Sequence, residues 1–167
     1  MIELKKTVIE NAQIIYKHFA GGMSGKPSFC IALDEKLAEE FREGGWPVKT
    51  YAKAPDESGH VSEPTQFLEV KLYFKGEGED TTPIVVSKDS GTGKKKRYNA
   101  NTIHRLDELR ITNAFAEIRP WYCDTKQYQG WCIALNRLYV EFASSGFDSL
   151  FDMDEGDDWA TDDVDAL

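Results

Sequence analysis

The part of the sequence that decides the fold reads ITNAFAEIRPWY over residues 111–122 and WCIALNRLYVEF over residues 131–142. In the first stretch Ala114, Ala116 and Ile118 alternate with larger or polar side chains, and the second stretch keeps the same period. Such alternation is typical of a strand with one buried face. The link Asp124–Gly130 is short enough for a hairpin, so two long antiparallel strands are predicted to close the body of the protein.

Shorter extended segments precede this hairpin. They are predicted at residues 4–19, Ser28–Leu33, Trp46–Tyr51 and Pro83–Ser87. Residues 67–74 alternate strictly between two sides. One side carries Leu68, Val70, Leu72 and Phe74, and the other carries Phe67, Glu69, Lys71 and Tyr73. Residues 54–65 and the Gly- and Lys-rich residues 87–97 are predicted to be loops.

Two short helices are predicted. The first follows Asp34, a suitable N-cap, places Leu37 and Phe41 on one face and ends at Gly44-Gly45. The second covers residues 99–110. The predicted fold class is therefore mainly β: a small, mostly antiparallel, partly open barrel like the five-stranded oligonucleotide-binding (OB) fold, with one or two short helices. A split α+β sheet is the alternative.

The net charge of −9 belongs to the end of the chain. Residues 148–167 hold nine acidic side chains and no Lys or Arg, whereas residues 1–147 hold 20 acids and 20 bases. An acidic segment with few cations is expected to stay unfolded. The predicted division is a globular domain at residues 1–147 and a flexible acidic tail at residues 148–167.

No motif in the sequence indicates catalysis. His18, His60 and His104 stand alone, without the spacing of a metal site. Residues 20–27 read AGGMSGKP, which departs from a phosphate-binding P-loop at its first glycine and at its final Ser or Thr. We therefore expect a protein without enzymatic activity, metal or cofactor.

The cysteine pattern and the hydropathy predict a compartment. Cys30, Cys123 and Cys132 form no CxxC pair, which favours reduced thiols over a disulfide framework. No stretch approaches the roughly 20 apolar residues that a membrane-spanning helix needs, and the first residues lack the apolar core of a signal peptide. A cytoplasmic protein without a membrane partner is expected.

Cations and aromatic side chains interleave in the body of the chain. Residues 94–97 are four consecutive cations, and such side chains bind phosphates with salt-dependent affinity. Aromatic rings beside cations suit single-stranded nucleic acid, whose unpaired bases expose faces for stacking. The rings predicted to bind are Trp46, Tyr51, Tyr98, Trp121, Tyr128 and Trp131. The predicted phosphate contacts are Lys49, Lys53, Lys94, Lys95, Lys96, Arg97, Arg119 and Arg137.

Strand alternation ranks some of these predicted binding rings and cations above the others. Counted in steps of two, Arg119 and Trp121 on one strand, and Trp131 and Arg137 on the other, lie opposite the small apolar residues.

In the tail, apolar residues scattered among the acids suit the groove of a partner protein, and the polyanion can compete with nucleic acid for the cations. The predicted partner-binding residues are Asp157, Asp158, Trp159, Asp162, Asp163, Asp165 and Leu167.

The order of several short motifs resembles the OB-fold single-stranded-DNA-binding proteins of tailed bacteriophages. These motifs are FAGG at 19–22, PSFCIALD at 27–34, GWPVK at 45–49, PIV at 83–85, IRPW at 118–121 and IALNRLYV at 133–140. The resemblance covers residues 16–142, and these proteins also carry an acidic tail after the globular body. Residues 1–15 have no counterpart, and the chain ends in Ala166-Leu167 where some members carry a terminal aromatic residue.

The resemblance implies sequence-independent binding of exposed single strands during phage replication or recombination, in the host cytoplasm. It also implies that the tail recruits replication enzymes; self-association is left open. The rival hypothesis is an acidic DNA mimic or host-takeover protein that occupies another protein's nucleic-acid groove. A nuclease accessory would need a set of metal ligands, which the sequence does not offer.

Overall fold

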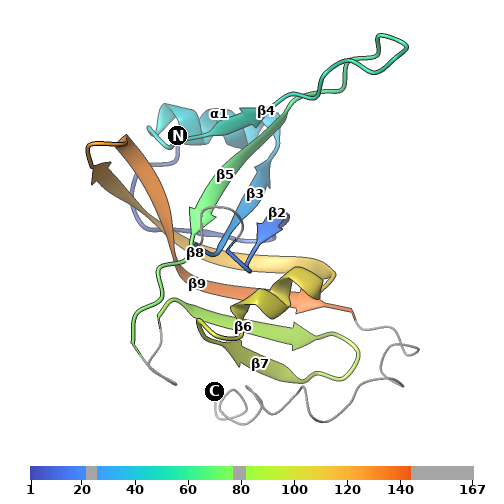
Figure 1. The fold of residues 1–167 in the computed structure, drawn as a ribbon, viewed down its shortest axis with the longest axis vertical. Helices are drawn as coiled ribbons and strands as arrows, with labels where there is room; N and C mark the ends of the chain where they lie inside the picture. Colours follow the sequence, from blue (N-terminus) through green and yellow to red (C-terminus); the bar gives the residue numbers. More distant parts are fainter. Residues whose placement is uncertain (22–25, 77–81, 144–167) are drawn as a thin grey trace.

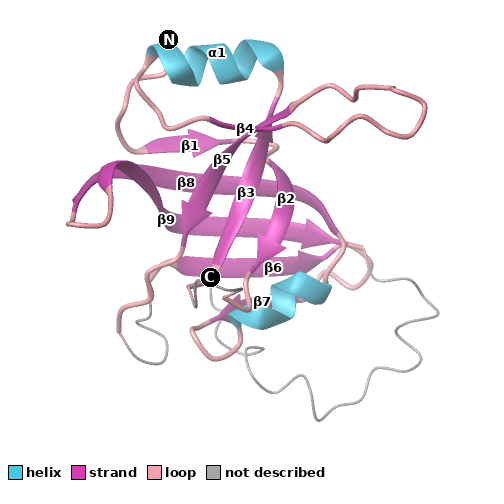
Figure 2. Ribbon diagram, turned by 45° about the horizontal axis from the view of Figure 1, so that its top comes forward, coloured by secondary structure: helices cyan, strands magenta, loops and turns pink. Residues whose placement is uncertain are grey.

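A computed structural model describes residues 1–21, 26–76 and 82–143 (Figure 1). Its largest feature is the predicted hairpin, formed by β8 (Ile111–Asp124) and β9 (Gln129–Phe142), each 14 residues long. The hairpin is confirmed, with longer strands than the alternation indicated. Its outer end curls away from the rest of the sheet as a projecting arm (Figure 2). We call residues 120–131 the hairpin arm.

The remaining strands wrap around this hairpin. In the order of pairing, β1 (Thr7–Ile9) lies beside β8 and is followed by β9, β5 (Thr65–Lys71), β3 (Ser28–Leu33) and β2 (Gln13–His18). The pairing of β5 with β9 is parallel and the others along this path are antiparallel. The described residues therefore form a mixed but mainly antiparallel sheet.

One bent segment spans the two ends of this sheet. The first half of residues 7–18 pairs with β8 and the second half with β3. Between the halves Asn11 has a left-handed φ of 53°, and the amide of Ala12 donates to the carbonyl oxygen of Ala114 at 2.8 Å. The ladder of the described strands is not a closed ring, so the predicted partly open, OB-like arrangement is confirmed.

A second hairpin extends the sheet beyond the bend of β9. The antiparallel strands β6 (Ile84–Asp89) and β7 (Lys95–Tyr98) add to the C-terminal half of β9, whereas β5 meets its N-terminal half. The prediction of a loop over residues 87–97 is therefore partly wrong. Tyr98 faces the core there, and its hydroxyl lies 2.7 Å from that of Ser87, which ties β7 to β6.

The helices are short and cover the ends of the sheet. In α1 (Glu35–Glu43) the Asp34 carboxylate accepts a hydrogen bond from the Leu37 amide at 2.7 Å, and Phe41 is buried, as predicted. The predicted second helix is only the 3₁₀ helix η2 (Ile103–Glu108). It starts late because the Asn99 side chain accepts from the Asn101 amide and holds a turn. No helix among the described residues could span a membrane.

Candidate nucleic-acid interface

The outer side of β5 carries the ring of Phe67, and a second ring, Tyr73, follows on the same side two residues beyond the end of the strand. Leu68, Val70 and Leu72 are buried beneath it, so Phe67, Glu69, Lys71 and Tyr73 point away from the core, as the alternation predicted. Tyr73 is six positions after Phe67, which corresponds to about 20 Å of extended chain. This row is the centre of the candidate interface.

At the Phe67 end, three rings from three strands meet. Tyr16 of β2 packs edge-on against Phe67 at 5.4 Å and against Tyr51 of β4 (Lys49–Tyr51) at 6.3 Å, between ring centroids. Tyr16 is 42% exposed and Tyr51 51%. Tyr16 has a left-handed φ of 47° at an irregularity in the β2–β3 pairing, and such bulges re-aim a side chain.

At the other end, the hairpin arm reaches Tyr73, two residues past the end of β5. Trp121 of β8 packs edge-on against Tyr73 at 5.6 Å, and the Lys26 ammonium lies 4.7 Å from the centre of the Tyr73 ring. Arg119, two residues before Trp121, donates from Nε to Oδ1 of Asn136 at 3.0 Å. Trp121 of the arm thus brings a second ring to Tyr73, while Arg119 just before the arm and Lys26 before β3 bring two cations.

We call this surface the aromatic face. It comprises the rings of Tyr16, Tyr51, Phe67, Tyr73 and Trp121 and the cations Lys26, Lys49, Lys71 and Arg119. Its acid Glu69 lies 3.2 Å from the Lys49 ammonium. Cations therefore exceed acids on this face, although residues 1–147 are neutral as a whole.

Two thiols and a phenol on the face stay uncharged at neutral pH. Burial, with the nearby Glu69 charge, raises the pKa of Cys30 to about 12. Burial also raises the pKa of Cys132, which lies opposite Trp121 on the sheet, and that of Tyr73. These groups add no negative charge that would repel an anionic ligand.

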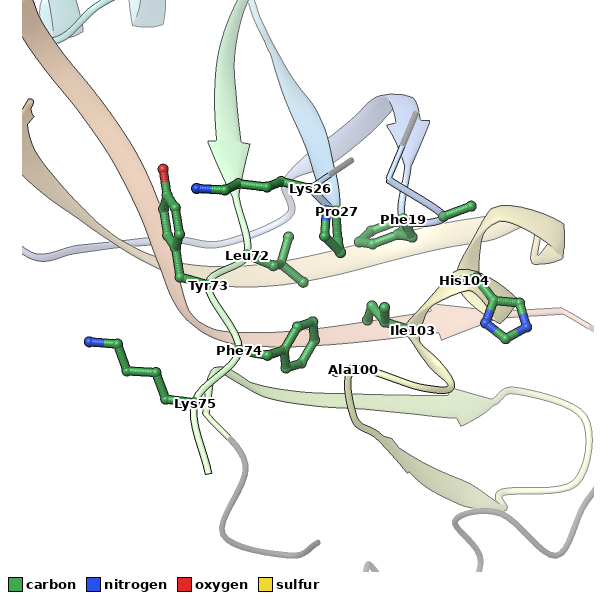
Figure 3. A pocket seen from close by; sticks show the side chains of 11 residues that line it. Phe19, Lys26, Pro27, Leu72, Tyr73, Phe74, Lys75, Ala100, Ile103 and His104 are labelled. Atoms are coloured by element: carbon green, nitrogen blue, oxygen red, sulfur yellow. The ribbon is translucent and has the colours of Figure 1, made fainter. Parts of the chain in front are cut away.

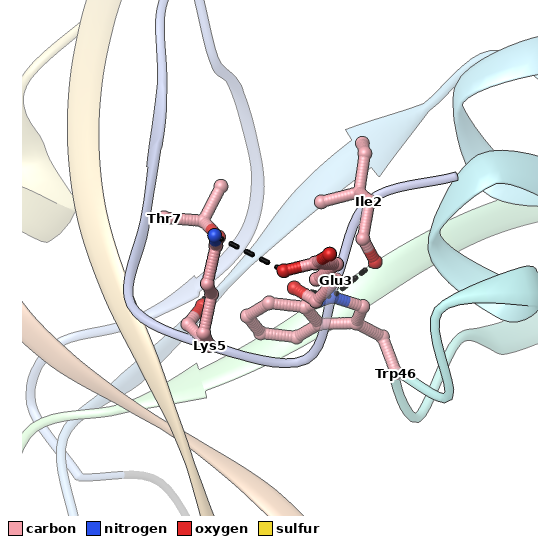
Figure 4. Close-up of polar contacts among 5 residues, drawn as sticks. All are labelled: Ile2, Glu3, Lys5, Thr7 and Trp46. Atoms are coloured by element: carbon pink, nitrogen blue, oxygen red, sulfur yellow. Dashed lines mark hydrogen bonds and ion pairs between the residues drawn. The ribbon is translucent and has the colours of Figure 1, made fainter.

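Two of the predicted rings lie in the core, which corrects the prediction for them. Trp46 is 3% exposed, packs edge-on against Phe41 at 5.3 Å and donates from Nε1 to the carbonyl oxygens of Ile2 and Glu3, both at 3.1 Å (Figure 4). Tyr98 is also 3% exposed, beneath the β6–β7 hairpin. Neither ring presents a face on which a base could stack.

The hairpin arm carries rings on both of its sides. Tyr128 is 50% exposed and Trp131 39%, and Trp131 packs edge-on against Tyr122 at 5.4 Å. The predicted shared face of Trp131 and Arg137 is wrong. A register shift leaves Asn136 as an extra residue in β9, so Trp131 alternates with Ile133 and Leu135 on the core side while Arg137 points outward.

No contact places the other predicted cations on the aromatic face among the described residues. Lys53 follows β4 in an exposed loop, Lys94 is in the β6–β7 turn, and Lys95, Lys96 and Arg97 are in β7. Arg137 binds both carboxylate oxygens of Glu117, at 2.9 and 3.1 Å, and this contact lowers the pKa of Glu117. Arg137 and Lys95 line a separate hollow of about 280 Å³ with Phe115 and Tyr139. The predicted tail residues lie outside the described residues.

Five members of the aromatic face were missing from the predicted set: Tyr16, Lys26, Phe67, Lys71 and Tyr73. The alternation of residues 67–74 already placed three of them on one side and could have identified them. Nothing local marks Tyr16 or Lys26, because their positions depend on contacts with rings far along the chain.

The fold and this face define a small, mainly β domain with exposed and half-buried rings and cations gathered on one side of a sheet. The family model described as "Putative phage ssDNA-binding domain" matches residues 1–150, and the chain belongs to this family. The resemblance inferred from the sequence motifs is thereby confirmed. No curated protein matches the sequence.

Several solved structures are similar to this chain. The single-stranded DNA-binding protein from bacteriophage Enc34 in complex with ssDNA is 15% identical, covering 86% of this chain and 89% of that one, with a TM-score of 0.46. Another structure of the Enc34 protein is 14% identical, with coverages of 92% and 89% and a TM-score of 0.48. The single-stranded DNA binding protein gp2.5 of bacteriophage T7 is 14% identical, with coverages of 91% and 96% and a TM-score of 0.29.

Proposed function

We propose that this protein binds single-stranded DNA without sequence preference, through the aromatic face, during phage DNA replication or recombination in the host cytoplasm. The observation that carries the proposal is the row along β5, with rings at both ends and cations between and beside them. The family of the chain supports the choice of ligand.

The chemistry of the face suits unpaired strands. Every base offers a π face, so stacking on Phe67, Tyr73 or Trp121 tolerates any sequence. Lys71 and Arg119 lie beside these rings and supply charges for the phosphates between the bases. Duplex recognition is disfavoured, because α1 presents Glu35, Glu39 and Glu43 to solvent and would repel the backbone of a major groove.

The protein acts by binding rather than by catalysis in this proposal. Residues 1–147 form the DNA-binding domain, and the tail, residues 148–167, recruits replication or recombination proteins and competes with DNA for the cations. The tail's nine acids and its interspersed apolar residues support these roles. The basic stretch 94–97 serves as a further phosphate contact for strands long enough to extend beyond the aromatic face.

A titration with poly(dT) tests the proposal. We expect quenching of tryptophan fluorescence in dilute buffer, because Trp121 lies on the aromatic face, and a loss of affinity as salt rises. A gel shift at two salt concentrations provides the second readout. Absence of quenching and of any shift at low salt would refute single-strand binding and favour the DNA-mimic hypothesis.

Removal of residues 148–167 tests the role of the tail. The truncated chain is neutral overall, so its cations no longer face a tethered polyanion and affinity for oligo(dT) is expected to rise. A second variant keeps the length of the tail but replaces its acids by their amides, which separates the effect of charge from that of length. Unchanged affinity in both variants would rule out competition while leaving DNA binding intact.

A further inference from the structure

A hollow opens where the chain leaves β5 at the Trp121 end of the aromatic face. Its volume is about 800 Å³, within the roughly 300–1,000 Å³ typical of pockets for small ligands. Figure 3 shows Tyr73, Lys26 and Lys75 on one side and His104 on the other, with Leu72, Phe74 and Ile103 between them. The floor is thus apolar and the rim is cationic.

The hollow and the aromatic face share two residues. Tyr73 and Lys26 line the hollow and also form the ring–cation pair beside Trp121. A single-stranded DNA that runs along β5 toward Tyr73 therefore arrives at the mouth of the hollow, where Lys26 can hold one of its phosphates. Lys75 is exposed on the same rim and offers a second cation.

Hydrogen bonds hold the far wall of the hollow in place. The two carboxylate oxygens of Asp107 accept from the amides of Phe19 and Ala20, each at 2.9 Å. The Lys17 ammonium donates to the carbonyl oxygens of Leu106 and Leu109 at the end of η2. The end of β2 and η2 are thereby locked together, and a preformed pocket loses little affinity to ordering.

We propose that this pocket takes one unstacked nucleobase of the bound strand, with the flanking phosphates on Lys26 and Lys75. The base lies against Phe74 and the aliphatic floor, and its polar edge faces His104, whose imidazole can donate or accept a hydrogen bond. The proposal rests on the proposed function and deepens it, because it fixes where one nucleotide leaves the row of stacked bases.

Photocrosslinking of the full-length chain tests the proposal directly. Oligo(dT) carrying 5-iodouracil at one position at a time is irradiated in the complex, and the modified residues are located by mass spectrometry. We expect one position to label Phe74 or His104, while other positions label Tyr73 or Trp121. Labelling confined to the rings of the aromatic face would overturn the pocket and leave single-strand binding standing. Absence of any complex would overturn both.

An affinity comparison provides the second readout. Phe74→Leu keeps an apolar side chain in the pocket but removes its ring, and stacking energies predict about a fivefold or larger loss of affinity for oligo(dT). Phe115→Leu is the matched control, because Phe115 lines the separate hollow on the outer side of β8. We expect it to stay within twofold of the unaltered protein. Equal affinities of the two variants, with the unaltered protein binding normally, would also overturn the pocket.

Discussion

Replacing Trp121 by alanine should weaken single-strand binding without changing its dependence on salt. Stacking of one base on an aromatic side chain is worth roughly 1–3 kcal/mol, so the dissociation constant is expected to rise about 5- to 150-fold. The loss should lie in the upper part of this range, because Tyr73 also loses the edge-on partner 5.6 Å away that holds its ring. No cation is removed, so the salt slope stays the same.

Fluorescence anisotropy with a labelled oligo(dT), measured at several salt concentrations, gives both quantities. The matched control is Trp46→Phe, which alters a tryptophan in the core. It removes the donor to the Ile2 and Glu3 carbonyls and should lower stability by about 1 kcal/mol while leaving affinity unchanged. Wild-type affinity for Trp121→Ala, or an equal loss for Trp46→Phe, would refute the assignment of the aromatic face.

Three further outcomes are expected. Replacing Lys94, Lys95, Lys96 and Arg97 together by alanine should reduce the salt slope by about 0.7 for each lost phosphate contact with a long oligonucleotide; an unchanged slope would mean that the β6–β7 hairpin does not touch DNA. Cys123, which is half-buried, should react with a thiol reagent at pH 8 in the folded protein faster than Cys132, whose pKa burial raises, and buried Cys30, with a pKa of about 12, should react only after unfolding; three equally fast thiols would contradict this. Arg137 lowers the pKa of Glu117 in the folded state, so this pair stabilises the fold above the usual carboxyl range and the contribution is lost as pH falls through the lowered value. Arg137→Gln should therefore reduce stability at pH 7 more than at pH 2 in chemical denaturation, and equal losses would refute the coupling.

Much of the local structure follows from the sequence because it depends on neighbours along the chain. The alternation of β8 and of residues 67–74 identified their buried sides, and Asp34 with Leu37 and Phe41 identified α1 and its start. The concentration of acids after residue 147 is likewise a property of composition. These patterns were enough to predict a mainly β, partly open barrel and to direct attention to rings and cations.

The membership of the site depends on contacts between distant parts of the chain. Trp46 stands close to lysines in the sequence, as a base-stacking ring would, yet hydrogen bonds to carbonyls near the N-terminus hold it in the core. Counting in twos cannot reveal the extra residue Asn136, which reverses the side of every position beyond it in β9.

The sequence alone thus determined most of the strands, with β7 missed, the first helix and the separation of charge, since each arises from periodicity or composition within a short stretch. Only the tertiary structure decided which rings share a surface. Tyr73 and Trp121 meet because β5 pairs with β9, and Tyr16 meets Phe67 because β2 reaches β5 across β3. Those contacts join residues about 50 positions apart, and no local pattern records which distant strands will lie side by side.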